Sequence, residues 1–336
     1  MLYATSLKEL ARLLNLAPST VSKALKGHPD ISEATQNRVR EMAKKVHYRP
    51  SALAKGLRDR RSYLIALIVP TLNDYFYVQV LRGILKGAYA REYKMIVFET
   101  HEQFDREAEI CFSLPKSGVD GLLIAPSKTT QDVRPLKALK QNGLPFVFFD
   151  RILGNIDADR VLGDDFQGAY QVVSHLIVSG CKHIAMFSSS QHWIWAQKRQ
   201  LGYMQSLQDH HITVDRQLIV EVDKMAEVRP LVNDLISRHD IDGIFACQDR
   251  MAIEVMDELQ KKGFPIPGNV AVCGFGNDPS ARIVSPALTT VDRKGLEMGK
   301  IAVDLLIDRI ENQGKKDTRT VLLKNELIIR DSSLVY

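Results

Sequence analysis

The sequence predicts a two-lobed α/β core, built on two doubly wound parallel sheets and preceded by a small all-α module. Two observations predict the core: continuous apolar strand patterns alternate with amphipathic helical patterns from residue 63 onward, and the strands form two successive series of four. Strands that lack polar alternation and are separated by helices are typical of parallel sheets covered on both faces. A third observation predicts the module, because residues 5–26 contain two short helical patterns instead.

The N-terminal helix pair has the pattern of a helix-turn-helix. Ser6 can cap the first helix, and the second begins near Pro18, where a missing N–H costs little. A three-residue turn joins them, Asn15-Leu16-Ala17. The apolar positions recur at helical spacing: Leu7, Leu10, Ala11, Leu14, Val21, Ala24 and Leu25. A polar, cationic second helix of this kind suits the DNA major groove, although an ordinary helical hairpin with a solvated face is an alternative.

A third helix and a linker follow. Ser32 can cap a helix whose apolar positions, Val39, Met42, Ala43 and Val46, close a three-helix core before Pro50. The next segment is short and basic and has too few apolar residues to bury by itself. We interpret it as a linker, or as a helix that forms only on binding.

The core patterns are the following. Strands are expected at 63–70, 94–99, 121–126, 145–150, 183–188, 218–222, 243–247 and 270–275. Helices are expected at 78–91, 103–116, 167–179, 197–210, 227–238, 250–262 and 295–312.

Ligands of such sheets bind beyond the carboxyl ends of the strands, and a cleft between two lobes is a natural small-molecule site. The residues at these strand ends are Asn73, Asp74, Phe76, Tyr77, Ser127, Asp150, Arg151, Ser188–Gln191, Gln248, Asp249 and Gly276–Asp278. Aromatic faces beside carboxylates, amides and a guanidinium suit a sugar or another polyol. Each of these residues could equally be an ordinary loop residue or a helix cap, and Asp249 and Asp278 in particular could cap the segments that follow them.

The formal net charge of +5 is unevenly distributed. Residues 1–61 hold 13 Lys and Arg against 5 Asp and Glu, which is +8, and the remainder carries −3. Nucleic acid is the natural partner of such a basic module.

The sequence gives little support for a membrane protein, a secreted protein, a metal-binding protein or an enzyme. No apolar run approaches the ~18 residues of a membrane span, and no apolar signal-peptide core opens the chain, so we expect a cytoplasmic protein without membrane contact. The four cysteines are scattered and predict reduced core thiols, not a metal site. The motifs GxGxxG after a strand, GxxxxGK[ST] and GxSxG are absent, so we expect no enzyme and no cofactor.

The chain is similar to the LacI/GalR family of bacterial transcription regulators over essentially its whole length. In the N-terminal part, the similar segments are SLKELARLLNLAPSTVSKALKG and DISEATQNRVREMAKKVHYRPSALAKGLR. In the core, they include IALIVPTLNDYFY, PFVFFDR, HLIVSGCKHIAMF, DGIFACQDRMAIEVMDEL and SPALTTVD. The core also resembles periplasmic sugar-binding proteins of the ribose-binding type.

The resemblance implies DNA contacts in the head and hinge. Pro18, Ser19 and Lys23 match positions that meet base edges, and Ala17, Thr20 and Ser22 lie nearer the phosphates. Residues 51–58 match a hinge helix that orders on operator DNA. The predicted DNA-binding residues are Ser6, Ala17, Pro18, Ser19, Thr20, Ser22, Lys23, Ala54, Lys55 and Leu57, the last wedging into the minor groove.

The resemblance also implies an effector site. The predicted effector contacts are Asp74, Phe76, Tyr77, Ser127, Asp150, Arg151, Arg199, Gln248, Gly276 and Arg293. Three of them depart from the family pattern: Gln248 stands where Asn is usual, Gly276 where Asp is frequent, and Arg293 where Gln is frequent. Losing a carboxylate and gaining a cation favours an acidic or phosphorylated sugar.

The sequence therefore predicts a homodimeric repressor that binds a pseudo-palindromic operator and is controlled by a small sugar or sugar derivative. The alternative is a soluble sugar-binding protein without regulatory DNA binding. The predicted boundaries are 1–49 for the head, 50–61 for the hinge and 62–336 for the core. Within the core, the N-lobe comprises about 62–160 with 292–318, and the C-lobe about 161–291 with 319–336.

Overall fold

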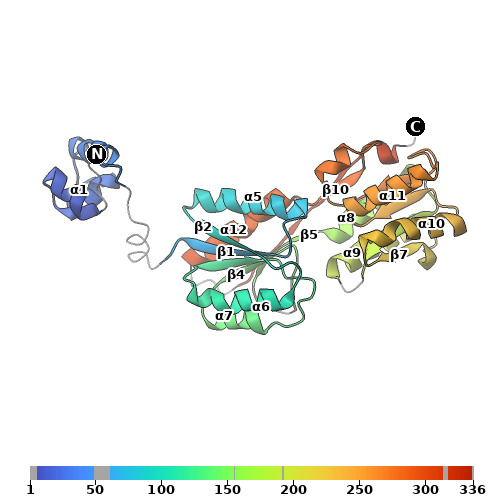
Figure 1. Cartoon of the computed structure of the whole chain (residues 1–336), viewed down its shortest axis with the longest axis horizontal. Helices are drawn as coiled ribbons and strands as arrows, with labels where there is room; N and C mark the ends of the chain where they lie inside the picture. Colours follow the sequence, from blue (N-terminus) through green and yellow to red (C-terminus); the bar gives the residue numbers. More distant parts are fainter. Residues whose placement is uncertain (1–5, 49–60, 155, 191–192, 313–316, 335–336) are drawn as a thin grey trace. The chain divides into compact units, whose positions relative to one another are not determined.

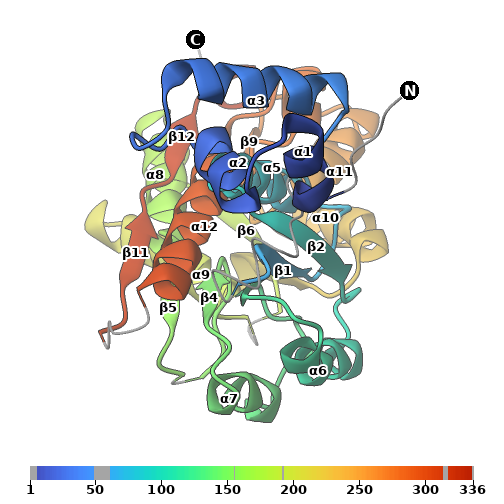
Figure 2. The ribbon, with the colours of Figure 1, turned by 90° about the vertical axis from the view of Figure 1, so that its left-hand side faces the viewer.

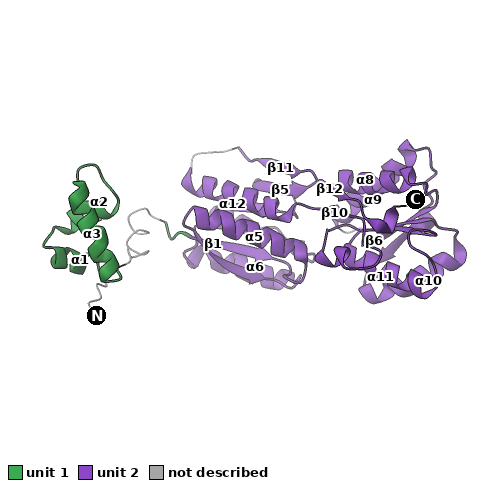
Figure 3. Cartoon of the chain, turned by 90° about the horizontal axis from the view of Figure 1, so that it is seen from above, with its two compact units in different colours: residues 1–63 green, residues 64–336 purple. Residues whose placement is uncertain are grey.

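The computed structural model describes residues 6–48, 61–154, 156–190, 193–312 and 317–334. The chain divides into two compact units, residues 1–63 and 64–336 (Figure 3). Most of the predicted hinge lies outside the described residues, and so do Ala54, Lys55 and Leu57.

The first unit contains the three predicted helices, α1 (Leu7–Leu14), α2 (Pro18–Leu25) and α3 (Glu33–Lys45), with α3 crossing the other two (Figure 2). Ser6 caps α1 through a capping box, since its hydroxyl accepts from the Glu9 N–H at 3.2 Å and its own N–H donates to the Glu9 carboxylate at 3.3 Å. The turn begins at Asn15 in the left-handed conformation, with φ of 53°. The core of the unit consists of Leu10, Ala11, Leu14, Val21, Ala24, Val39, Ala43 and Val46.

The N-lobe of the second unit is a parallel sheet of six strands in the order β11-β5-β4-β3-β1-β2. Its strands are β1 (Leu64–Val69), β2 (Lys94–Glu99), β3 (Gly121–Ile124), β4 (Phe146–Phe149), β5 (Asp159–Gly163) and β11 (Thr320–Leu323). Helices α5 (Tyr75–Ala90) and α12 (Gly295–Glu311) cover one face of the sheet, and α6 (Phe104–Ser113) and α7 (Arg134–Gln141) the other (Figure 1). The middle strands β1, β3 and β4 are thus buried on both faces, as the unalternating strand patterns predict, whereas the edge strand β2 is largely exposed.

The C-lobe is a parallel sheet of four strands in the order β7-β6-β8-β9. Its strands are β6 (Ile184–Ser189), β7 (Ile219–Val222), β8 (Gly243–Ala246) and β9 (Ala271–Cys273). Helices α8 (Asp165–Val178) and α9 (Ile194–Asp209) lie on one face, and α10 (Val228–Arg238) and α11 (Asp249–Lys261) on the other (Figure 3). An antiparallel pair, β10 (Thr290–Asp292) and β12 (Glu326–Ile328), packs against α8.

The chain crosses between the lobes three times, after β5, after β10 and after β11. These crossings correct the predicted lobe boundaries, because β5 and β11 pair in parallel within the N-lobe sheet. The N-lobe therefore extends to Gly163 and Leu323 instead of 160 and 318. Two short strands at one edge of a sheet, with partly polar sequences, give no apolar run that the pattern could detect.

Two glycines allow α5 and α12 to pack so closely that the backbone of one helix contacts the backbone of the other. A methyl group at Gly83 would lie 2.1 Å from the Leu296 carbonyl oxygen, and one at Gly299 would lie 2.1 Å from the Val80 carbonyl oxygen. Neither oxygen can move without shifting its helix.

We therefore predict that Gly83→Ala lowers the free energy of unfolding by about 1–3 kcal/mol or more, as overpacking does in a close-packed core. The control is Gly268→Ala, whose methyl group meets only the Pro265 Cβ at 3.4 Å. Urea unfolding of both variants measures the difference. Equal stability of the two variants would contradict the close contact between α5 and α12 at Gly83.

Candidate functional site

A cavity of about 280 Å³ lies at the carboxyl ends of the strands and is lined by both lobes. The predicted effector residues on its wall are Asp74, Phe76, Tyr77, Asp150, Arg151, Arg199, Gln248, Gly276 and Arg293. Sequence reasoning did not assign the further lining residues Glu102, Lys128, Trp195, Arg250 and Phe275 to it. The structure thus brings nine of the ten predicted residues to one cavity.

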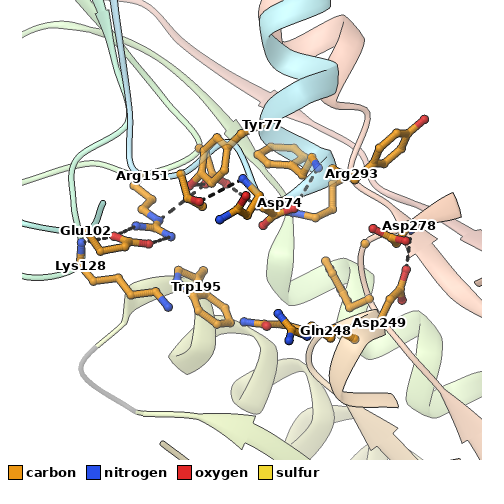
Figure 4. A pocket seen from close by; sticks show the side chains of 18 of the residues that line it. Asp74, Tyr77, Glu102, Lys128, Arg151, Trp195, Gln248, Asp249, Asp278 and Arg293 are labelled. Carbon is orange, nitrogen blue, oxygen red and sulfur yellow. Dashed lines mark hydrogen bonds and ion pairs between the residues drawn. The ribbon is translucent and has the colours of Figure 1, made fainter. Parts of the chain in front are cut away.

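Asp150 lies at the centre of the N-lobe wall, where it contacts Tyr77, Arg151 and Arg293. Figure 4 labels these three neighbours. Asp150 follows β4 directly with φ of 61°, a conformation that Asp tolerates better than most residues. One carboxylate oxygen accepts a hydrogen bond from the Tyr77 hydroxyl at 2.6 Å, and the other pairs with the Arg293 guanidinium. Burial raises the pKa of Tyr77 well above its usual value, with Asp150 adding to the rise and the two arginines opposing it, so the phenol stays protonated and donates.

Arg151 forms the next part of the wall. Its guanidinium makes two parallel hydrogen bonds to the Glu102 carboxylate, at 2.9 and 3.1 Å, and a third to the Pro126 carbonyl at 3.2 Å. Its Nε lies 3.8 Å from Asp150. Glu102 follows β2, the strand whose carboxyl end the sequence reasoning left without a candidate, so applying the same rule to that strand would have identified it.

Arg199 is fixed within the C-lobe wall and is only 2% exposed. Its guanidinium lies between the rings of Trp195 and Phe275, 4.7 and 3.7 Å from their centres. Two of its nitrogens donate to one carboxylate oxygen of Asp165, at 2.9 and 2.7 Å. This arginine therefore presents an ordered, neutralised surface to the cavity.

The remaining predicted residues have definite structural roles. Phe76 lies beneath Arg293, whose guanidinium is 3.6 Å from the ring centre. Asp74 caps α5 by accepting from the Phe76 N–H at 2.9 Å. Ser127 does not line this cavity, because its hydroxyl shares a buried 2.6 Å hydrogen bond with Thr100. Gly276 has φ of 148°, which favours glycine at this position.

Asp249 is the buried carboxylate of the C-lobe wall, 3% exposed. It accepts hydrogen bonds from the Thr290 hydroxyl and from the Asp278 N–H, the latter at 2.7 Å. Burial raises the pKa of Asp249 to about 6 despite these hydrogen bonds. A side chain at Gly276 would have its Cβ 3.4 Å from this carboxylate, so an aspartate there would add a second negative charge beside it.

The raised pKa gives a pH-dependent contribution to stability. Between pH 4 and 6 the folded state keeps a proton on Asp249 that the unfolded chain, with its ordinary value of 3.8, has lost. The contribution of Asp249 to the free energy of unfolding is therefore fully present below pH 4. It is lost as the pH rises through 6, and the loss amounts to about 3 kcal/mol.

We predict that Asp249→Asn gains stability relative to the parent as the pH rises from 4.5 to 7.5, because the amide stays neutral. Urea unfolding of both proteins at four pH values in this range measures the difference. A stability difference that does not change with pH would contradict a carboxylate that ionises near pH 6.

The candidate DNA-binding surface belongs to the first unit. Ser6, Ala17, Pro18, Ser19 and Lys23 are exposed, whereas Thr20 and Ser22 are half-buried. The Lys23 amine pairs with Asp30 at 3.0 Å, and this hydrogen bond lowers the pKa of Asp30. The exposed start of α2 is thus free of large apolar side chains, and the last turn of the helix carries one cation, Lys23.

Two family models match the chain. The model of bacterial regulatory proteins of the lacI family matches residues 6–51, and that of the periplasmic binding protein-like domain matches residues 173–333. The regulator NtdR of the NTD biosynthesis operon of Bacillus subtilis (strain 168) is 28% identical over 98% of this chain and 99% of its own. The transcriptional repressor PurR of Vibrio vulnificus (strain CMCP6) is 27% identical over 97% of this chain and 98% of its own.

A solved structure has the same fold over nearly the whole chain. The complex of the transcriptional regulator CelR with cellobiose superposes with a TM-score of 0.73 at 24% identity, covering 98% of this chain and 100% of the other. The predicted architecture, a helix-turn-helix head before a periplasmic-binding-protein-like core, is confirmed. Within the described residues, no helix is long and apolar enough to cross a membrane.

Proposed function

This chain belongs to the lacI family of bacterial regulatory proteins, and we propose that it is a dimeric repressor whose binding to a pseudo-palindromic operator is controlled by a sugar or sugar derivative in the cleft. One observation carries the proposal: a family-matched DNA-binding head precedes a core whose two lobes enclose a cavity lined by carboxylates, guanidinium groups and aromatic rings.

The head supplies the DNA-binding part of the proposal. We place the exposed start of α2 in the major groove, where Ser19 and Lys23 reach base edges and Ala17, Thr20 and Ser22 lie against the phosphates. The Lys23–Asp30 pair is exposed, so phosphate or guanine can replace Asp30 as the partner of the amine at little cost. Leu57 and its neighbours in the hinge lie outside the described residues and stay a prediction from the sequence.

Exposed apolar side chains of the N-lobe support the dimer. Leu85 and Tyr89 stand one turn apart on α5 and are 48% and 87% exposed. Ile96 and Val97 are exposed on β2, the edge strand of the sheet. A second copy of the chain would remove this apolar surface and an open strand edge from water.

The connections of the cleft suggest how the effector acts on the dimer. Arg293 lies in the crossing between β10 and α12, and it pairs with Asp150 of the N-lobe. Asp74 caps α5, the helix that carries Leu85 and Tyr89. An effector that closes the lobes therefore shifts α5 and α12, and effector and operator weaken each other by the same factor.

The test begins with the full-length protein and a random DNA library, from which the bound sequences are selected. A gel-shift titration with the selected duplex is then repeated with a panel of sugars that includes cellobiose. We expect a palindromic site and one class of sugar that changes the affinity. Sugar binding without any selected DNA would instead support a soluble sugar-binding protein.

A further inference from the structure

A second cavity of about 180 Å³ adjoins the cleft. The two cavities share the lining residues Lys128, Asp150, Arg151 and Trp195, so one ligand can occupy both. The rest of the second wall is largely apolar, with Ile152, Leu153, Leu162, Trp193 and Ile194. The site is therefore longer than the polar cleft that the strand ends predict.

Half of the charged side chains on this combined surface form ion pairs with one another. Arg151 is paired with Glu102, Arg199 with Asp165 and Arg293 with Asp150. These three ion pairs leave no net charge for a ligand. In particular, the extra cation at Arg293 that favoured an acidic sugar in the sequence is neutralised by Asp150 and covered by Phe76.

Two lysines of the second cavity differ from these arginines. Within the described residues, neither the Lys128 amine nor the Lys198 amine has an ion pair. The Lys128 amine lies 5.9 Å from the ring centre of Trp193, and both side chains are half-buried. In Figure 4 Lys128 extends along the cavity toward Trp195. Two such amines on an apolar wall leave positive charge without a counter-ion.

The first cavity, at the other end of the site, carries carboxylates instead of amines. Asp74, Asp249 and Asp278 line the first cavity and accept hydrogen bonds only from backbone N–H groups or hydroxyls among the described residues. Carboxylates of this kind accept further hydrogen bonds from sugar hydroxyls. Arg250 also lines this cavity, but its side chain is exposed and its charge is screened by water. The site thus has an end where buried carboxylates accept hydroxyls and an end where two half-buried amines can accept an anion.

We infer that the effector is a sugar derivative carrying a phosphate or carboxylate, with its hydroxyls at Asp74 and Asp249 and its anionic group at Lys128 and Lys198. This inference rests on the proposed function and names the ligand class of the same site. An anion between the two amines gains charge-assisted hydrogen bonds in surroundings where water competes poorly. A neutral monosaccharide leaves both amines without a partner.

Calorimetric titration of the full-length protein tests the inference with matched probes: ribose and ribose 5-phosphate, glucose, glucose 6-phosphate and glucuronate, and inorganic phosphate alone. We expect one phosphorylated or acidic sugar to bind at least about tenfold more tightly than its neutral parent. Lys128→Gln and Lys198→Gln should each weaken binding of the charged sugar about tenfold more than binding of its neutral parent, and the arginine variants should restore the preference. Lys140→Gln, at an exposed pair with Asp157, is the control.

The outcomes separate the two proposals. Equal affinity for a charged sugar and its neutral parent, or glutamine variants that bind like the parent protein, would overturn this inference and leave the repressor proposal intact. Tight binding of inorganic phosphate alone would overturn it too, because the hydroxyl end would then contribute nothing. If no sugar binds although operator DNA is selected, the sugar-controlled part of the proposed function fails, and this inference fails with it.

Discussion

Replacing Arg199 by methionine is expected to lower the free energy of unfolding by about 3–5 kcal/mol, the usual effect of breaking a buried ion pair on one side. The side chains of Arg199 and Asp165 are 3% and 10% exposed. Methionine can still fill the space between Trp195 and Phe275, so the lost volume is small. What remains is the Asp165 carboxylate, held away from water without its cation.

The matched control is Arg229→Met. Arg229 also reaches two carboxylates, Glu254 at 2.9 Å and Asp257 at 2.7 Å, but it lies on the surface, where solvent screens such pairs. Urea unfolding of both variants should therefore give a large loss for Arg199 and almost none for Arg229. The double variant Arg199→Met with Asp165→Asn should recover part of the loss, because it removes the buried charge. A loss of equal size in both arginine variants would show that burial does not govern the strength of this pair.

The head and most of the core elements could be predicted because their signals are local. A capping serine, a proline at the first turn and apolar residues at helical spacing all fall within a few residues of one another, and α1, α2 and α3 form where they indicate. The eight apolar runs likewise became strands, since parallel sheets bury both faces. The edge strand β11 and its neighbour β5 were not predicted because they are short and only partly buried.

The cleft could be located from the sequence, but its electrostatics could not. The strand-end rule and the family resemblance together brought nine of ten residues to one cavity. Whether a charged residue is free depends on partners far away in the chain, and Arg293 meets Asp150 across 143 positions. The same is true of Arg151 with Glu102 and of Arg199 with Asp165. The sequence therefore shows the additional cation at Arg293 but not the carboxylate that neutralises it.

Asp150→Asn is expected to weaken binding of the effector sugar by at least about 100-fold, because removing one partner of a buried, hydrogen-bonded charge pair costs about 2–5 kcal/mol. Asn tolerates the left-handed backbone of this position as well as Asp does, and its amide oxygen can still accept from Tyr77. Arg293, whose side chain is 14% exposed, loses the carboxylate that holds it over Phe76. The N-lobe wall then carries a positive charge without its counter-ion, and the Arg293 side chain is no longer held in one position.

Operator binding by the sugar-free Asp150→Asn protein should stay within about threefold of the parent, well below 1 kcal/mol, because the head is a separate compact unit. The variant should therefore bind the operator with an affinity that no longer responds to the sugar. Gel-shift titrations with and without sugar, together with calorimetry, measure both halves of this expectation. The control is Asp157→Asn, which removes a carboxylate from an exposed pair with Lys140 and should leave both affinities unchanged. If Asp150→Asn weakened operator binding and sugar binding equally, the carboxylate would be supporting the fold of the core, and its place at the centre of the effector site would be refuted.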